Sequence, residues 1–330
     1  MSVCVVQKST RTEQSAPVLA QQHRDNAATL STDFDSETAN MNALLYVAVV
    51  LIWGTTWIGI TLQGQQAAPL TAIFWRFAIA AAVLLGGLVL TGRLQRLRWR
   101  DHGFCVLQSL CVFSLNFVCF YTAVRYINSG LESVIFSMAV FFNALNSWWF
   151  FGQKPHARFV PAACMGLLGI VLLFWHELDF SAWHAGQLWG IGLAMLGTYG
   201  FSLGNMLSVR HQQHGLDVFS TNAYAMLYGT LVLALLAYVF EVSLALPMSA
   251  AFVWPLLYLA VFGSVIGFTA YFTLVKRLGA AQSAYATLLF PLVALSISTV
   301  CEGYQWRWAA VVGMVLILVG NYLMFHRPKA

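Results

Sequence analysis

Two charged side chains stand inside long apolar stretches of this chain, a setting where charge is costly and usually functional. Glu132 follows "YINSG" and Arg76 lies in "FWRFA". A carboxyl group there can bind a proton or an ammonium group, and a guanidinium can bind the carboxylate of a small molecule. Simpler roles are open too. Glu132 would cap a helix with its carboxylate in water, and Arg76 would reach the interface or pair with Glu132. The sequence favours these simpler roles.

A tryptophan near the middle of an apolar stretch is a third candidate. In "LIWGTTWIG", Trp53, Thr56, Trp57 and Ile60 fall on one face of a helix. An indole N–H in hydrocarbon needs a partner, so we expect Trp53 to face a cavity or another helix. It would either stack on a substrate or pack between helices, with Gly54 allowing a close approach.

Neutral polar side chains recur along other apolar stretches. Glu132, Phe136 and Asn143 lie on one stripe of a helix at about 100° per residue. For the neutral groups the alternative to a binding role is an interhelical hydrogen bond, worth about 0.6 kcal/mol. The candidate residues of a substrate-binding cavity are Trp53, Thr56, Arg76, Asn116, Glu132, Phe136, Asn143, Tyr199, Ser202, Tyr271 and Tyr285.

The composition shows what must position these residues. Hydrophobic residues make up 59% of the 330 residues and charged residues only 9%. A soluble domain has about a quarter of its residues charged, so this chain has too little charge to cover a soluble surface. The composition predicts an all-α integral membrane protein.

Ten apolar windows have the length of about 20 residues that a membrane helix needs. Outside the membrane, all Lys and Arg residues except Arg125 and Arg307 then fall on one side. The positive-inside rule places that side, with both termini, in the cytoplasm. The predicted transmembrane helices are 43–62, 70–91, 104–124, 129–151, 159–175, 187–208, 217–239, 252–274, 281–301 and 307–325.

The segment before the first window differs from the rest of the chain. Residues 1–40 are polar, mixed in charge and without the apolar core of a secretory signal. We expect them to be disordered. Either they form a cytoplasmic tail, or translation starts at Met41 and the tail is an artefact of the assigned start.

The windows form two related halves. Tyr121 matches Tyr271 and Ser133 matches Ser283 at a constant offset, and the halves are predicted over 41–178 and 179–330. Each half holds an odd number of helices, so the second must be inverted relative to the first. Inverted repeats are typical of secondary transporters, in which the halves exchange conformations around a site at the membrane midplane.

Three motifs resemble those of the drug/metabolite transporter superfamily, in its EamA-type branch of ten-helix carriers: "LIWGTTWIG", "PLTAIFWRFAIAA" and "YTAVRYINSGLESVIFS". The glycine-rich last span of each half adds to the resemblance. The resemblance covers about 43–325. It implies a bacterial inner-membrane carrier, often an exporter of amino acids or related small metabolites. The family commonly has Glu at the end of the fourth span, where this chain has Gln153, while the second half keeps Glu302.

Other classes of function find no support in the motifs. The chain has no HExxH or P-loop, so we expect neither an enzyme nor an ATP-driven pump. His211 and His214 lack a third ligand nearby, and we expect them in a solvated loop with no metal and no cofactor.

The prediction is therefore a secondary transporter that exports amino acids or related small metabolites by alternating access, with proton coupling as one option. The alternatives are an uncoupled facilitator and a translocator of lipid precursors or drugs on the same fold. The expected partners are a small-molecule substrate and the lipid bilayer, without nucleic acid. Both a monomer and a homodimer fit the sequence.

Overall fold

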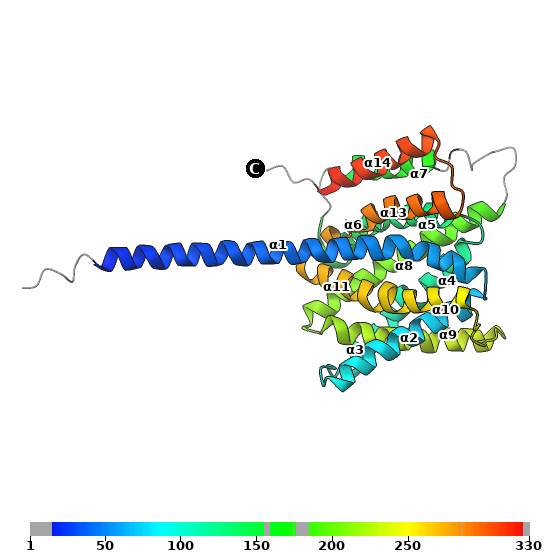
Figure 1. The fold of residues 1–330 in the computed structure, drawn as a ribbon, viewed down its shortest axis with the longest axis horizontal. Helices are drawn as coiled ribbons and strands as arrows, with labels where there is room; N and C mark the ends of the chain where they lie inside the picture. Colours follow the sequence, from blue (N-terminus) through cyan, green and yellow to red (C-terminus); the bar gives the residue numbers. More distant parts are fainter. Residues whose placement is uncertain (1–14, 155–158, 174, 176–184, 285, 326–330) are drawn as a thin grey trace, which may run out of the picture. The chain divides into compact units, whose positions relative to one another are not determined.

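The computed structural model describes residues 15–154, 159–173, 175, 185–284 and 286–325, and every regular element in these ranges is a helix (Figure 1). The chain divides after Leu45 into two compact units. The first unit contains the beginning of helix α1 (Ser15–Gly64). The second unit, from Tyr46 onward, contains the rest of α1 and all the other helices.

Ten helical spans follow one another in the described ranges, and four of them are built from shorter helices. Each overlaps one predicted window. Apolar stretches of this length fold as helices because lipid offers no partner to backbone N–H and C=O groups. The spans are α1, α2 (Pro69–Leu90), α3–η1–α4 (Trp99–Gln108, Ser109–Ser114, Leu115–Ala123), α5–α6 (Ser129–Phe136, Ala139–Phe151), α7 (Phe159–Leu173), α8 (Ala185–Gln213), α9 (Val218–Val239), α10–η2–α11 (Ala250–Tyr258, Leu259–Ile266, Gly267–Leu278), α12–α13 (Ala280–Ser283, Ala286–Cys301) and α14 (Trp308–Phe325).

Length and composition single out most of these spans as membrane-crossing. Six of the described helical spans are long and apolar enough to cross a membrane. They are the first four spans and those of α9 and α10–α11. Two shorter apolar stretches, Leu289–Cys301 and Trp308–Gly320, lie in the last two spans.

The start of α1 differs from the sequence prediction. Disorder is predicted for residues 1–40, whereas α1 begins at Ser15. Pro17 stands in the first turn, where a missing N–H removes no helical hydrogen bond. No further proline or glycine follows before Gly54, so nothing in the sequence interrupts the helix over that length.

The helix ends that position the candidate residues carry clear local signals. Asn128 caps α5, because its side chain accepts a hydrogen bond from the Leu131 N–H at 2.8 Å. Asp217 caps α9 in the same way, accepting from the Ser220 N–H at 2.8 Å. Helix α6 ends at Phe151 and is capped by Gly152, whose φ of +67° is in the left-handed region that glycine adopts freely.

Helices with the same place in the two halves pack against each other. The pairs α7 with α14, α5 with α13 and α2 with α9 are all in contact, and the first two are visible in Figure 1. Two matched glycines make the α7–α14 crossing possible. A Cβ on Gly169 would lie 2.6 Å from the Gly313 carbonyl oxygen of α14, and one on Gly320 would lie 2.8 Å from the Ala162 carbonyl oxygen of α7. The contact is therefore reciprocal, as a pseudo-two-fold relation requires.

The third and eighth spans each contain a π-helix, η1 and η2, in the same relative place. A widened turn leaves a carbonyl oxygen without its usual donor, and π-helical segments often mark functional sites. Ser114 donates its hydroxyl to the Ser109 carbonyl oxygen at 2.8 Å, and Ser264 donates to the Leu259 carbonyl oxygen at 2.9 Å. No sequence pattern predicts these segments.

Candidate functional site

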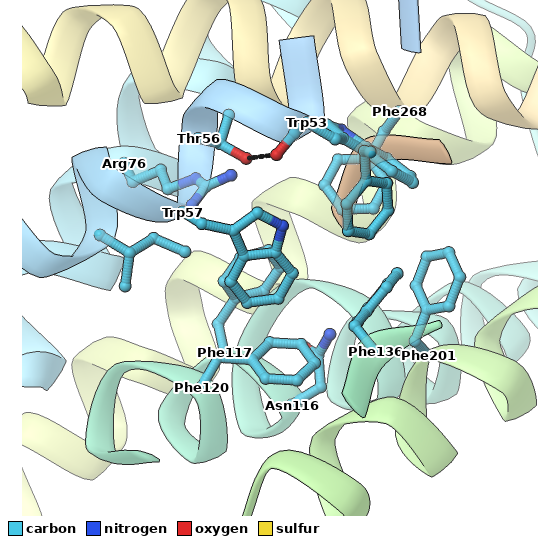
Figure 2. Close-up of a pocket in the computed structure, with 12 residues that line it drawn as sticks. Trp53, Thr56, Trp57, Arg76, Asn116, Phe117, Phe120, Phe136, Phe201 and Phe268 are labelled. Atoms are coloured by element: carbon cyan, nitrogen blue, oxygen red, sulfur yellow. Dashed lines mark hydrogen bonds between the residues drawn. The ribbon is translucent and has the colours of Figure 1, made fainter. Parts of the chain in front are cut away.

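Both halves contribute to a buried, mostly aromatic pocket in the second unit (Figure 2). The volume of its cavity is about 30 Å³, which is enough for one or two water molecules. A cavity of this volume is too small for any molecule much larger than water. The pocket is lined by Trp53, Thr56, Trp57, Ile60, Arg76, Asn116, Phe117, Phe120, Phe136, Phe201, Phe268 and Phe290.

Trp53 connects the first helix to the π-helix of the second half. Its indole N–H donates to the Gly263 carbonyl oxygen of η2 at 3.2 Å. Its ring centroid lies 5.0 Å from those of Phe268 and Tyr271 and 5.8 Å from that of Phe201. Trp53 thus packs between helices and also forms part of the pocket wall, so the two roles considered for it do not exclude each other.

Two further polar side chains of the pocket have no hydrogen-bond partner among the described residues. They are the Trp57 indole nitrogen and both the amide nitrogen and the oxygen of Asn116. Trp57 is 5% exposed and Asn116 3% exposed, so neither is satisfied by the surface. A buried polar group without a partner is costly and calls for an explanation, and a ligand that forms the missing hydrogen bonds is one.

Arg76 is the one charged residue of the pocket lining, and it is only 2% exposed. Its Nε donates to the Ser264 hydroxyl at 2.9 Å and its Nη1 to the Tyr121 hydroxyl at 3.5 Å. Tyr121 in turn donates to Gln63 at 2.8 Å. The guanidinium carbon also lies 4.5 Å from the Phe117 ring centroid. The expected positions for Arg76, at the interface or paired with Glu132, are wrong because neutral partners from both halves hold it in the interior.

Glu132 is completely buried, and neither carboxyl oxygen has a hydrogen-bond partner in the part of the chain that the structure describes. The expectation of a cap with its carboxylate in water is therefore wrong. Asn128 is the cap, and α13 covers this end of α5 closely enough that a Cβ on Gly130 would lie 2.7 Å from Leu295. Glu132 does not line the pocket.

Three other predicted residues, Asn143, Ser202 and Tyr271, belong to a hydrogen-bonded layer next to the pocket. The Asn205 amide nitrogen donates to the Asn143 oxygen at 3.1 Å and to the Tyr271 hydroxyl at 3.2 Å. The Asn146 amide donates to the Ser202 hydroxyl at 2.9 Å. We call these five residues the polar layer. It joins α6 and α8 to α11, and therefore ties the first half to the second.

A second cavity, of about 400 Å³, lies beyond the polar layer. Along α8 the pocket residue Phe201 is followed one turn later by Asn205 of the layer, and one turn after that by Val209 of this cavity. Along α11 the corresponding order is Phe268, Tyr271 and Val275. The polar layer thus separates the pocket from a larger space, which we call the vestibule, lined by Ser147, Phe151, Gln153, Val209, Gln212, Gln213, Val275, Lys276, Gly279 and Ala280.

Five of the candidate residues line the pocket, namely Trp53, Thr56, Arg76, Asn116 and Phe136. Asn143, Ser202 and Tyr271 belong to the polar layer, and Glu132 is buried apart from both. Tyr199 is not part of the pocket, because its side chain is 40% exposed and packs on Phe142 with ring centroids 5.4 Å apart. Tyr285 lies outside the described residues.

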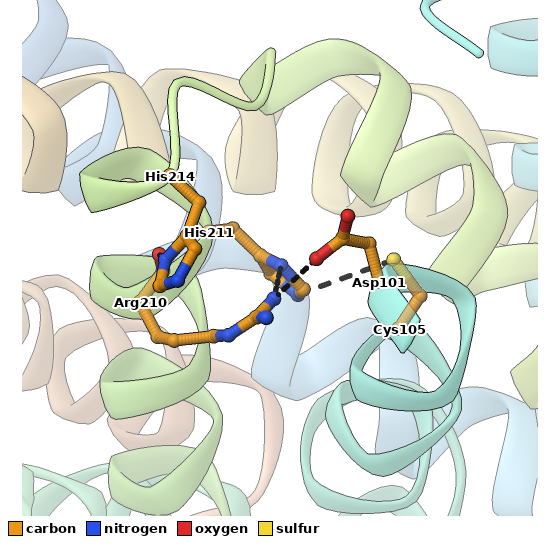
Figure 3. A network of polar contacts seen from close by, with 5 residues as sticks. All are labelled: Asp101, Cys105, Arg210, His211 and His214. Carbon is orange, nitrogen blue, oxygen red and sulfur yellow. Dashed lines mark hydrogen bonds and ion pairs between the residues drawn. The ribbon is translucent and has the colours of Figure 1, made fainter. Parts of the chain in front are cut away.

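The histidines of "RHQQH" are not in a solvated loop together, as Figure 3 shows. His211 lies in α8, is 1% exposed, and approaches the Cys105 sulfur at 4.0 Å. Its neighbour Arg210 forms an ion pair with Asp101 at 2.8 Å and lies 3.7 Å over the Phe104 ring. This cluster fastens α3 to the end of α8. Among the described residues no group of His, Cys, Asp or Glu has the arrangement of a metal site.

Two inverted helical halves that enclose a buried pocket define a class of integral membrane proteins that move small molecules. The sequence model of the EamA-like transporter family matches residues 40–175 and again 188–326. The chain therefore belongs to the EamA-like transporter family and is a membrane transporter. The predicted fold, ten transmembrane helices in two inverted five-helix repeats, is confirmed.

Individual relatives agree with this assignment. The inner membrane transporter YedA of Escherichia coli K12 is 27% identical over 293 residues, covering 85% of this chain and 92% of YedA. Protein PagO of Salmonella typhimurium is 23% identical over 283 residues, covering 85% of this chain and 91% of PagO. A solved crystal structure with 17% identity has a TM-score of 0.66 and covers 86% of this chain and 96% of that one, which shows the shared fold.

Proposed function

We propose that this protein is a secondary transporter of the inner membrane that exports amino acids or related small metabolites by alternating access, coupled to protons. One observation carries the proposal. The guanidinium of Arg76 and the titratable carboxyl group of Glu132 are both buried, yet they are not paired with each other, and no ion pair of either exists among the described residues. Each is therefore available to an ion that comes and goes.

The proton is the ion that fits Glu132. An ionised carboxylate without hydrogen bonds in an apolar interior costs several kcal/mol, so in this conformation the carboxyl group holds its proton. A conformation that opens the α5–α13 contact to water would remove that cost and release the proton. The Arg76 guanidinium donates to the Tyr121 hydroxyl at 3.5 Å and keeps its positive charge for the substrate.

The closed pocket and the vestibule support alternating access. The distribution of Lys and Arg, with Lys276 at the vestibule, favours a cytoplasmic position for this cavity. The polar layer would then be the inner gate. Its hydrogen bonds are few and neutral, each worth about 1 kcal/mol or less, so a modest free energy would open it.

The proposal is tested by efflux from liposomes that contain the purified protein. The liposomes are loaded with amino acids and with carboxylic acids of the same carbon skeletons, and efflux is followed without a pH gradient and with gradients of both signs. Saturable efflux that responds to the sign of the gradient is expected. Trp53→Ala should reduce it, because this residue joins α1 to η2 at the pocket wall.

Glu132→Gln is the decisive variant, and Glu241→Gln, which removes an exposed carboxylate, is its matched control. We expect the response to the gradient to disappear in Glu132→Gln and to persist in the control. Saturable efflux that ignores both the gradient and Glu132 would show an uncoupled facilitator instead. The absence of flux for the whole panel would contradict the proposed class of substrates.

A further inference from the structure

The polar groups of the pocket differ in kind from those that an amino acid requires. An amino acid carries a carboxylate, which accepts hydrogen bonds, and an ammonium group, which donates three. A site for both needs donors and acceptors, and usually a carboxylate against the ammonium. Arg76 is the single charged residue of the twelve that line the pocket.

The donors are plentiful. The hydrogen bonds of Arg76 within the described part of the chain use Nε and Nη1 and leave Nη2 without one. Figure 2 shows the guanidinium reaching between Thr56 and Trp57. The Trp57 indole N–H and the Asn116 amide N–H₂ are also without partners. Three separate residues therefore offer unused N–H groups to an acceptor such as a carboxylate.

The acceptors are few. The Thr56 hydroxyl already donates to the Trp53 carbonyl oxygen at 2.9 Å, and the Asn116 oxygen is the one acceptor of the lining whose hydrogen bond is wholly missing. Glu132 does not reach the pocket lining. An ammonium group bound here would meet the positive charge of Arg76, with the Asn116 oxygen, the Thr56 hydroxyl oxygen and aromatic faces as compensation but no carboxylate.

The rest of the wall is aromatic. Phe136 lies with its ring centroid 4.7 Å from that of Phe201 and 5.6 Å from that of Phe290, and the ring of Trp57 lies 5.6 Å from Phe136. Aromatic faces that pack on one another when the pocket is closed would pack on a flat apolar body when it opens. The pocket thus combines one cationic side chain and unused N–H groups with a mostly aromatic wall.

From this chemistry we infer that the substrate is a small monocarboxylate with a flat apolar body and no free ammonium group. The inference rests on the proposed function and narrows its substrate class. The carboxylate binds to Arg76, with Trp57 and Asn116 completing its hydrogen bonds, and the apolar body lies among the phenylalanine rings. Amino acids bind less well, because their ammonium group loses its hydration without gaining partners.

Three compounds that share a phenylethyl group test the inference by calorimetric titration of the purified full-length protein. They are 3-phenylpropanoate, which has only the carboxylate, L-phenylalanine, which has both groups, and phenethylamine, which has only the ammonium. We expect 3-phenylpropanoate to bind roughly tenfold or more tightly than phenylalanine, because burying an ammonium group without hydrogen-bond partners weakens the affinity by at least that factor. Phenethylamine should not bind.

Variants separate the role of each group. Arg76→Gln should abolish binding of 3-phenylpropanoate, whereas Arg125→Gln, which removes an exposed arginine, should leave it unchanged. Asn116→Asp keeps the shape of the side chain and adds an acceptor, so it should shift the preference toward phenylalanine. This second variant decides the question if Arg76→Gln does not fold, as judged by its thermal unfolding.

Phenylalanine that binds as tightly as 3-phenylpropanoate would overturn the inference, and so would binding that survives Arg76→Gln in the folded protein. A preference unchanged by Asn116→Asp would also count against it. None of these results concerns proton-coupled transport, which fails only if the efflux experiment shows no saturable, gradient-dependent flux. The two claims can therefore fail separately.

Discussion

Ser114 and Ser264 occupy the same place in the two halves, and each hydroxyl donates to the carbonyl oxygen five residues before it. The two serines differ in one respect. Ser264 also accepts a hydrogen bond from Arg76 at 2.9 Å, whereas the hydrogen bond described for Ser114 stays within its own helix. The π-helix of the second half therefore contacts Arg76, the charged residue of the pocket, whereas no hydrogen bond described for Ser114 reaches it.

This asymmetry predicts different effects for two matched variants. Ser114→Ala and Ser264→Ala should each lower the free energy of unfolding by about 1 kcal/mol, because each leaves a carbonyl oxygen without its donor. Only Ser264→Ala should also weaken substrate binding, since it frees the Arg76 guanidinium from its position. Thermal unfolding and titration with 3-phenylpropanoate measure the two effects, and equal losses of affinity in both variants would contradict the assignment.

The polar layer predicts a change in access to the pocket. Asn205→Ala removes the hydrogen bonds to both Asn143 and Tyr271, so the route from the vestibule should open more often. The measurement is the rate at which a membrane-impermeant thiol reagent modifies Phe201→Cys in a background without native cysteines. We expect the rate to rise several-fold when Asn205→Ala is added and the reagent is on the vestibule side. An unchanged rate would mean that the layer does not control access.

The glycine contacts predict which substitutions destabilise the fold. Gly169→Ala would place a Cβ 2.6 Å from both a backbone oxygen and Ile317 of α14, and should cost about 1–3 kcal/mol by overpacking. Gly86→Ala in α2 meets nothing within 4 Å and should be neutral or stabilising by up to about 1 kcal/mol. Unfolding temperatures in detergent compare the two. A Gly169→Ala protein as stable as wild type would argue against the close α7–α14 crossing.

The sequence predicts the fold well because the bilayer imposes a simple rule. Apolar windows of one length must be helices, and matched pairs such as Tyr121 with Tyr271 and Ser133 with Ser283 indicate the repeat. Charge is as easy to detect, so Arg76 and Glu132 stand out in their apolar stretches. Polar side chains at depth also identify part of the site, as Asn116 does in the pocket and Asn143 in the polar layer.

The sequence does not reveal what covers each residue. Glu132 stands in the first turn of α5, and only the packing of α13 decides that it is buried rather than in water. Phe201, Phe268 and Phe290 line the pocket, yet they have the same character as phenylalanines that face lipid. The two π-helices have no sequence signature at all. These features come from contacts between halves that lie far apart along the chain.

Proton movement driven by substrate is the most direct measurement of the central claim, that Arg76 binds the substrate and Glu132 binds the proton. Liposomes with an internal pH dye are given the best-transported compound of the efflux panel, and protein-free liposomes supply the background. The wild type should show a change in internal pH when the compound moves. Glu132→Gln should show none, while still exchanging labelled for unlabelled compound. Proton movement that persists in Glu132→Gln would contradict the account.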